Sequence, residues 1–106
     1  MKNMNILVVG AGIGGLSAAI ALTRDGHAVT VIERDPNWSV YGVGIIQQSN
    51  VIRAMDQLGV LDKFMDAACG FDAVEIFLPD GTKVARVPSP RLVEGRPANV
   101  GIGRRA

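Results

Sequence analysis

The stretch that decides the fold reads Asn5-Ile-Leu-Val-Val-Gly10-Ala-Gly12-Ile-Gly-Gly15. It begins as a wholly apolar run rich in branched side chains, which is typical of a strand buried on both faces of a parallel sheet. The glycines that follow match the pattern G-x-G-x-x-G at positions 10, 12 and 15. We therefore predict a strand, a tight turn and the start of a helix.

The next residues complete the unit. A helix is expected from Ile13 or Gly14 to about Asp25, and Gly26 follows it as a C-terminal stop. A second apolar run, residues 28–32, predicts another buried strand. A strand, a helix and a strand within about thirty residues form a βαβ unit with a parallel strand pair.

The glycine positions suit one kind of ligand. Gly10 allows the tight turn, Gly12 removes a side chain where a pyrophosphate must approach the backbone, and Gly15 lets the helix pack closely on the sheet. The phosphates would meet unpaired amides and the positive end of the helix dipole. Glu33 ends the second strand, and its carboxylate can accept hydrogen bonds from both ribose hydroxyls of an adenosine, which disfavours the 2′-phosphate of NADP. This context predicts a dinucleotide site.

The rest of the chain predicts smaller elements. Residues 38–44 are expected to form a loop. A helix from Ser49 to Leu58, capped by Ser49 or Asn50 and stopped by Gly59, precedes a short helix at residues 61–68. Two alternating runs, residues 73–78 and 82–87, flank an Asp-Gly pair and predict a hairpin, followed by a proline-rich loop.

Composition narrows the class of protein. The chain has 106 residues, 48% of them hydrophobic, which is enough for one domain with a buried core. Its net charge of +1 gives no reason to expect a nucleic-acid or membrane partner. Cys69 is the single cysteine, so an intrachain disulfide and a cysteine metal cluster are excluded, and a cytoplasmic location is expected.

Three further features are interpreted as structural. The uncharged stretch from Ile6 to Leu22 resembles a targeting segment, but it contains four glycines and is barely long enough to span a bilayer. His27 is the only histidine and has no catalytic or metal partner in view, and Cys69 is interpreted as a small packed residue. Neither residue is expected to carry chemistry.

Several segments together resemble one enzyme family. They are residues 12–19, 31–35, 42–45, 58–62 and 100–106, which read GIGGLSAA, VIERD, GVGI, LGVLD and VGIGRRA. The combination is similar to the FAD-dependent aromatic hydroxylases, the group A flavoprotein monooxygenases. The resemblance implies a Rossmann-like FAD-binding α/β fold with a parallel sheet core, and implies that the last segment starts a further helix.

The resemblance also implies roles for individual residues. Around the FAD pyrophosphate it places Gly10, Gly12, Ile13, Gly14 and Gly15. It places Glu33 on the adenosine ribose and Arg34 along the adenosine. It implies that Val43, Gly44 and Ile45 form a backbone loop near the cofactor, and that Arg104 approaches its phosphate or ribityl region.

Whole enzymes of this family are several hundred residues long. The resemblance therefore implies that residues 1–106 are the N-terminal part of an FAD-binding domain, without the substrate domain and inactive alone. The whole enzyme would use NADH or NADPH and O2 to hydroxylate a small aromatic substrate. Because apolar strands without neighbours expose a sheet edge, we expect self-association or pairing with the remainder.

Other functions remain open at this point. A reductase, a halogenase or an amine oxidase can share the same start, although the Arg-x-Gly-Gly-Arg stretch usual in amine oxidases does not follow Glu33. An NAD-dependent dehydrogenase is disfavoured by the predicted hairpin, which stands where a third βα unit is expected. A non-catalytic nucleotide-binding module is the alternative from another class.

Overall fold

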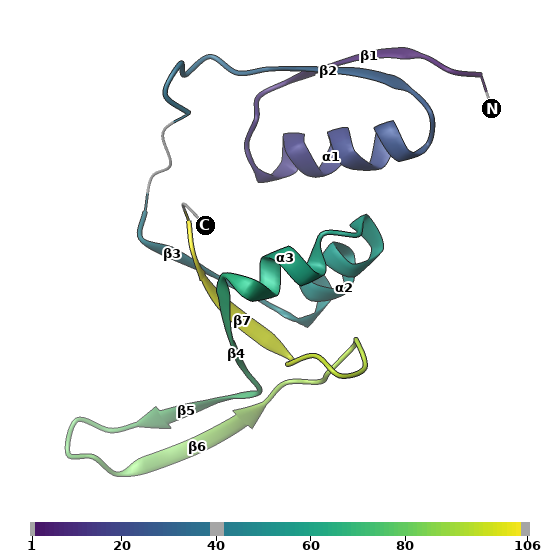
Figure 1. The fold of residues 1–106 in the computed structure, drawn as a ribbon. Helices are drawn as coiled ribbons and strands as arrows, with labels where there is room; N and C mark the ends of the chain where they lie inside the picture. The colour runs from purple at the N-terminus through teal and green to yellow at the C-terminus, as the bar shows by residue number, and fades with distance from the viewer. Residues whose placement is uncertain (1, 39–41, 105–106) are drawn as a thin grey trace. The chain divides into compact units, whose positions relative to one another are not determined.

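A computed structural model describes residues 2–38 and 42–104 (Figure 1). The chain divides into two compact units, Met1–Val40 and Tyr41–Ala106. The fold is mixed α/β, with a parallel strand pair in the first unit and antiparallel sheets in the second. The described residues contain no helix that is both long enough and apolar enough to cross a membrane.

The first unit is the predicted strand–helix–strand arrangement. Strand β1 (Asn5–Val9) and strand β2 (Ala28–Ile32) pair in parallel, in register from Asn5 opposite Ala28 to Val9 opposite Ile32. Helix α1 (Ile13–Arg24) connects them and packs against both (Figure 1). Gly26 adopts a φ of 92° directly after the helix, which a residue with a side chain rarely does, so the predicted stop is confirmed.

One prediction for these strands is wrong. They were expected to be buried on both faces, but burial alternates along each strand. Val8 and Val31 lie on the half-buried side, whereas Leu7, Val9 and Ile32 are exposed by 58%, 77% and 46%. The physical reason is that α1 covers one face of this two-stranded sheet and leaves the other open in the described chain.

Two helices begin the second unit after its first strand. Helix α2 (Ser49–Leu58) presents Ile52, which is 1% exposed, to the core, and helix α3 (Leu61–Asp66) follows it. Gly59 ends α2 in the left-handed conformation, as predicted. The predicted cap is wrong: the N-cap residue is Gln48, and no side chain caps the helix.

A three-stranded antiparallel sheet completes that core. Strand β7 (Asn99–Gly103) lies between β3 (Gly44–Gln47) and β4 (Ala68–Phe71). Val100 of β7 is fully buried and packs with Ile52 and Leu61.

This sheet corrects three predictions. The short helix stops at Asp66, because Ala68 already pairs with Ile102. Gly44 belongs to a strand instead of a loop, and residues 99–103 form a strand instead of starting a helix. Strands of four or five residues that contain glycine have little propensity of their own, so their long-range pairing decides their conformation.

The hairpin is confirmed. Strand β5 (Ala73–Phe77) pairs antiparallel with β6 (Lys83–Pro88). Gly81 in the turn has a φ of 90°, which explains the glycine there. An exposed ion pair of 2.9 Å joins Lys83 Nζ to Glu75 Oε1 across the strands.

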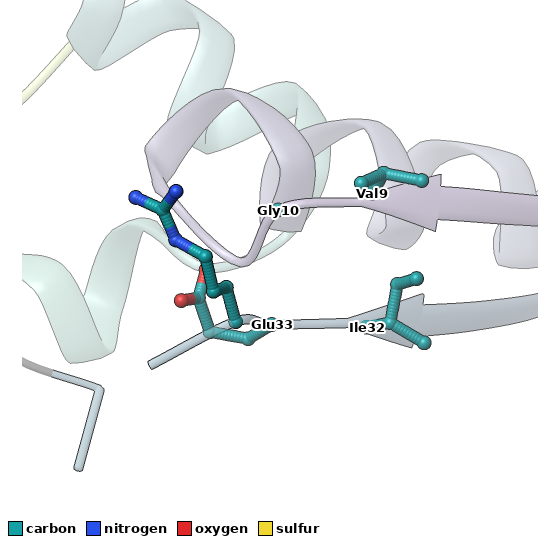
Figure 2. Close-up of a pocket in the computed structure, with 5 residues that line it drawn as sticks. Val9, Gly10, Ile32 and Glu33 are labelled. Atoms are coloured by element: carbon teal, nitrogen blue, oxygen red, sulfur yellow. The ribbon is translucent and has the colours of Figure 1, made fainter. Parts of the chain in front are cut away.

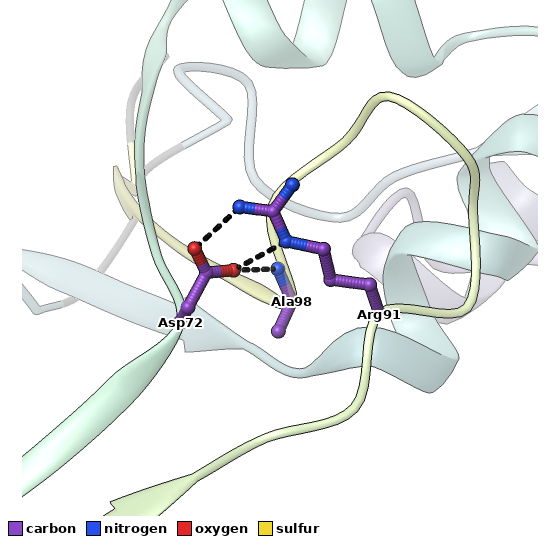
Figure 3. A network of polar contacts seen from close by, with 3 residues as sticks. All are labelled: Asp72, Arg91 and Ala98. Carbon is purple, nitrogen blue, oxygen red and sulfur yellow. Dashed lines mark hydrogen bonds and ion pairs between the residues drawn. The ribbon is translucent and has the colours of Figure 1, made fainter.

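Asp72, between β4 and β5, anchors the loop that leads to β7 (Figure 3). Its Oδ1 accepts hydrogen bonds from Arg91 Nε at 3.0 Å and from the Ala98 amide at 2.9 Å. Its Oδ2 accepts one from Arg91 Nη2 at 2.5 Å. The Arg91 guanidinium and the Ala98 amide together hold the pKa of the Asp72 carboxyl below its usual range.

Acid is therefore expected to weaken this anchor. The folded chain binds the charged carboxylate better than the unfolded chain does, so the contribution to stability is present above about pH 4 and is lost as the pH falls further, through the folded pKa. Denaturant unfolding at several pH values should show that Asp72→Asn is less stable than wild type near neutrality and loses less stability on acidification. Asp66→Asn, on α3, controls for the loss of one negative charge. Parallel pH curves for Asp72→Asn and wild type would count against the anchor.

Candidate functional site

The glycine turn starts at the end of β1. Gly10 has a φ of 105°, and its amide donates a hydrogen bond of 2.8 Å to the carbonyl oxygen of Ile32. Only glycine adopts this conformation without strain. The chain can therefore leave β1 while its last amide still pairs with β2.

Gly15 lies in the first turn of α1, directly against the residue that starts the turn. A Cβ atom on Gly15 would lie 1.9 Å from the carbonyl oxygen of Gly10 and 3.3 Å from Cγ1 of Val8. The helix can approach β1 this closely only because residue 15 has no side chain.

Gly12 differs from Gly10 and Gly15. It has an ordinary φ of −78°, and a Cβ atom on it would meet nothing within 4 Å. Gly14, in the helix, also faces open space. Neither the backbone nor the packing of this chain requires glycine at these two positions, so they leave the surface of the turn accessible to a ligand.

The start of α1 offers unpaired donors in that space. Its first internal hydrogen bond runs from the Leu16 amide to the Gly12 carbonyl oxygen, at 2.9 Å. No side chain caps the helix and no acidic residue lies in its first turn. Within the described part of the chain, the amides of residues 12–15 have no hydrogen-bond partner. These amides and the helix dipole favour an anion.

Glu33 points to the same turn. Its Oε1 accepts a hydrogen bond of 3.1 Å from the Ala11 amide, and its Oε2 accepts one of 2.7 Å from the Asp35 amide. The Asp35 amide first and the Ala11 amide second hold the pKa of the Glu33 carboxyl below its usual range, so it is charged at neutral pH. Each oxygen keeps a lone pair, and the side chain is exposed, so it can accept further hydrogen bonds from hydroxyl groups.

A hollow of about 450 Å³ lies beside this carboxylate (Figure 2). It is lined by Val9, Gly10, Ile32, Glu33 and Arg34. The two branched side chains provide an apolar surface, and the two charged residues lie next to it. Such a combination suits a ligand with a flat apolar part and a hydroxylated part.

The other predicted site residues lie in the second unit. The Arg104 amide donates a hydrogen bond of 3.2 Å to the Val43 carbonyl oxygen, and Gly44 is paired with Gly103. Arg104 also passes over Gly42, where a Cβ atom would lie 3.2 Å from Cδ of Arg104. The structure thus brings Val43, Gly44 and Arg104 to one end of the β3–β7 pair.

The predicted backbone loop at residues 43–45 is only partly correct. Gly44 and Ile45 are strand residues, fixed by pairing with β7, and only Val43 precedes the strand. Val43 is 96% exposed. Tyr41, in the predicted loop at residues 38–44, and Arg105, in the segment 100–106, lie outside the described residues.

The structure also shows the roles of three residues that the predicted site does not include, namely Trp38, His27 and Cys69. Trp38 Nε1 donates a hydrogen bond of 2.7 Å to the Ala11 carbonyl oxygen, so both residues belong to the turn. His27 is buried, and its Nδ1 accepts a hydrogen bond of 3.1 Å from the Met4 amide, which indicates a structural role. The prediction for Cys69 is wrong: it is exposed on β4, because it points away from the small core of the unit.

Known proteins are similar to this chain in sequence. A family model described as FAD binding domain matches residues 3–98. The chain is 36% identical over 103 residues to 3-hydroxybenzoate 6-hydroxylase of Polaromonas naphthalenivorans, covering 92% of this chain and 24% of that protein. It is 46% identical over 63 residues to Monooxygenase 1 of Arabidopsis thaliana, covering 59% of this chain and 16% of that protein.

Solved structures show the same relation. The fold is similar to that of 2-methyl-3-hydroxypyridine-5-carboxylic acid oxygenase, with a TM-score of 0.78 and 27% identity, covering 98% of this chain and 26% of that one. It is also similar to Klebsiella pneumoniae HpxO, solved with FAD and uric acid, with a TM-score of 0.76 and 28% identity, covering 96% of this chain and 26% of that one. The chain thus spans about a quarter of the length of these proteins. It belongs to the FAD-binding domain family of the group A flavoprotein monooxygenases and corresponds to their N-terminal part.

Proposed function

We propose that residues 1–106 bind FAD as part of a monooxygenase that hydroxylates an aromatic or related small molecule with NAD(P)H and O2. The observation that carries the proposal is the accessible glycine turn, with unpaired amides and with the Glu33 carboxylate hydrogen-bonded beside it. The relatives carry names of hydroxylases and monooxygenases, which supports the reaction class. FAD, when bound, supplies the redox chemistry, and the protein supplies binding and orientation.

The residues of the first unit fit the ADP part of FAD. We propose that the diphosphate is bound by the turn that contains Gly10, Gly12, Ile13, Gly14 and Gly15. Glu33 would accept hydrogen bonds from the adenosine ribose, and Arg34 would lie along the adenosine in the hollow of Figure 2. The unpaired amides of residues 12–15 are complementary to the diphosphate, and the charged Glu33 carboxylate is complementary to the ribose hydroxyls.

The residues of the second unit would contact the other part of the cofactor. We propose that Val43, Gly44 and Ile45 present backbone groups to FAD and that Arg104 pairs with its phosphate or ribityl region. The hydrogen bond between the Arg104 amide and the Val43 carbonyl oxygen supports a shared role for the two segments.

Three further statements belong to the same proposal. The chain is inactive without the parts that its longer relatives contain, and it works in the cytoplasm. It also self-associates or pairs with the remainder of a longer protein, which the exposed side chains of Leu7, Val9 and Ile32 support. Size-exclusion chromatography that shows a cooperatively folding monomer would contradict the association.

Cofactor retention tests the proposed function. Purified chain is mixed with FAD or with NAD and passed over a desalting column, while flavin fluorescence follows binding. The expected result is retention of FAD and not of NAD, because both share ADP but only FAD engages both sets of residues. Failure to retain FAD, or equal retention of NAD, would overturn the proposal.

A further inference from the structure

The peptide groups on either side of Ala11 are held from outside the glycine turn. The Ala11 amide donates to Glu33 Oε1 at 3.1 Å, and its carbonyl oxygen accepts from Trp38 Nε1 at 2.7 Å. Both partners come from the segment after β2, and Trp38 is 27 residues away from Ala11 in sequence. A turn that contains four glycines out of six residues would otherwise be held by few side chains.

These two contacts fix two successive peptide planes. The Ala11 carbonyl and the Gly12 amide belong to one planar unit, so the indole that binds the carbonyl also sets the direction of the Gly12 N–H. Glu33 fixes the preceding plane in the same way, and that plane carries the Gly10 carbonyl against which Gly15 packs. A donor on a carbonyl also polarises the peptide and strengthens its N–H as a donor.

Hydrogen bonds among residues 33–38 hold Trp38 in place. Its φ is 47°, and among the described residues it is the only one other than glycine with a positive φ. The Trp38 amide donates to the Asp35 carbonyl oxygen at 3.0 Å, and the Asn37 amide donates to Asp35 Oδ1 at 2.9 Å. The Asp35 amide in turn donates to Glu33 Oε2. A strained conformation that several hydrogen bonds maintain indicates a function for the side chain that it places.

We propose that Trp38 is a positioning residue for the diphosphate: its indole N–H holds the Ala11–Gly12 peptide so that the Gly12 amide is aimed at a phosphate oxygen. The inference rests on the proposed function. It assigns to Trp38 no contact with the cofactor itself. Trp38 acts through the backbone of the turn, and the nucleoside part of the ligand does not depend on it.

Three ligands separate this role from a merely structural one. FAD and ADP contain the diphosphate, whereas adenosine does not. Trp38→Phe keeps an aromatic ring but removes the N–H donor, and we expect it to weaken FAD and ADP about tenfold, the loss of one well-placed hydrogen bond. Adenosine should bind Trp38→Phe and wild type equally.

A second variant restores the donor. In Trp38→His, Nε2 is as many bonds from the ring attachment as the indole nitrogen is, so the neutral imidazole with a proton on Nε2 can donate to the same carbonyl. We expect ADP binding within about threefold of wild type, since most of one hydrogen bond is regained. Phe77→Leu, an exposed aromatic of the β5–β6 hairpin, is the matched control and should bind all three ligands as wild type does.

Isothermal titration calorimetry of the whole chain and its variants measures their affinities for FAD, ADP and adenosine. Equal ADP affinity for Trp38→Phe and wild type would overturn the positioning role. A loss of adenosine binding as large as the loss of ADP binding, or no rescue by Trp38→His, would overturn it too, because each points to a general effect on the fold. Wild type that binds neither FAD nor ADP would contradict the proposed function instead.

Discussion

Gly15→Ala is expected to unfold the first unit, and with it to abolish FAD binding. The added methyl group would lie 1.9 Å from the Gly10 carbonyl oxygen and 3.1 Å from its carbonyl carbon. Both atoms are backbone, and Gly10 is also hydrogen-bonded to Ile32, so no side chain can move aside. Overpacking typically costs about 1–3 kcal/mol, and a clash with fixed backbone should reach about 3 kcal/mol or more.

The neighbouring glycine provides the control for stability. Gly14→Ala adds the same methyl group one residue earlier, where it meets nothing within 4 Å. Alanine favours a helix over glycine by about 1 kcal/mol, so this variant should be as stable as wild type or more stable. Thermal unfolding followed by circular dichroism compares the two. If Gly15→Ala melts at the temperature of wild type, the close packing of α1 on β1 is wrong.

Gly12→Ser is expected to have the opposite profile, a folded chain that has lost its cofactor. Gly12 is the N-cap residue of α1, with a φ of −78° and a ψ of −175°, and serine is among the preferred residues at such a position. The serine side chain would enter open space and use the amides that the diphosphate needs. We expect FAD affinity to fall about 100-fold, which corresponds to about 2.7 kcal/mol, with no loss of thermal stability.

The comparison depends on measuring both quantities on the same samples. Titration with FAD gives the affinity, and thermal unfolding without ligand gives the stability. Ala18→Ser, at an exposed position of α1 outside the glycine pattern, should leave FAD affinity unchanged. Wild-type affinity in Gly12→Ser would show that the phosphates bind elsewhere.

The first unit was predictable because its determinants are local. The apolar run, the glycine turn and the helix stop follow each other within 32 residues, and the two strands pair in the register that this short connection allows. The hairpin was predictable for the same reason, since Asp80-Gly81 sits between its strands. Which faces of β1 and β2 are buried was not predictable, because burial depends on what covers the sheet and not on the strand sequence.

The antiparallel sheet was largely missed. Ala68 pairs with Ile102, more than thirty residues away, and neither short segment has a strong preference for a strand. Gly101 and Gly103 lower that preference further, so the residues themselves did not indicate a strand, and the expected helix start came from the family resemblance. Strand β7 is central because it pairs with both β3 and β4, and its Val100 packs with Ile52 and Leu61 in the core.

The site was predictable where glycine and a carboxylate mark it. The structure confirms that Glu33 meets the glycine turn, through the Ala11 amide. Trp38 was not distinguishable from an ordinary loop residue, because its positive φ and its hydrogen bond to Ala11 arise from folding. A hydrogen bond between residues so far apart leaves no pattern in a single sequence.

The central claim is that the amides of residues 12–15 receive the diphosphate of the cofactor. Nuclear magnetic resonance of chain labelled with ¹⁵N-glycine tests it directly, because Gly12, Gly14 and Gly15 then report on their own amides. ADP should shift these three resonances strongly, and adenosine should leave them nearly unchanged. If ADP binds without shifting them, or adenosine shifts them equally, the diphosphate does not lie on this turn.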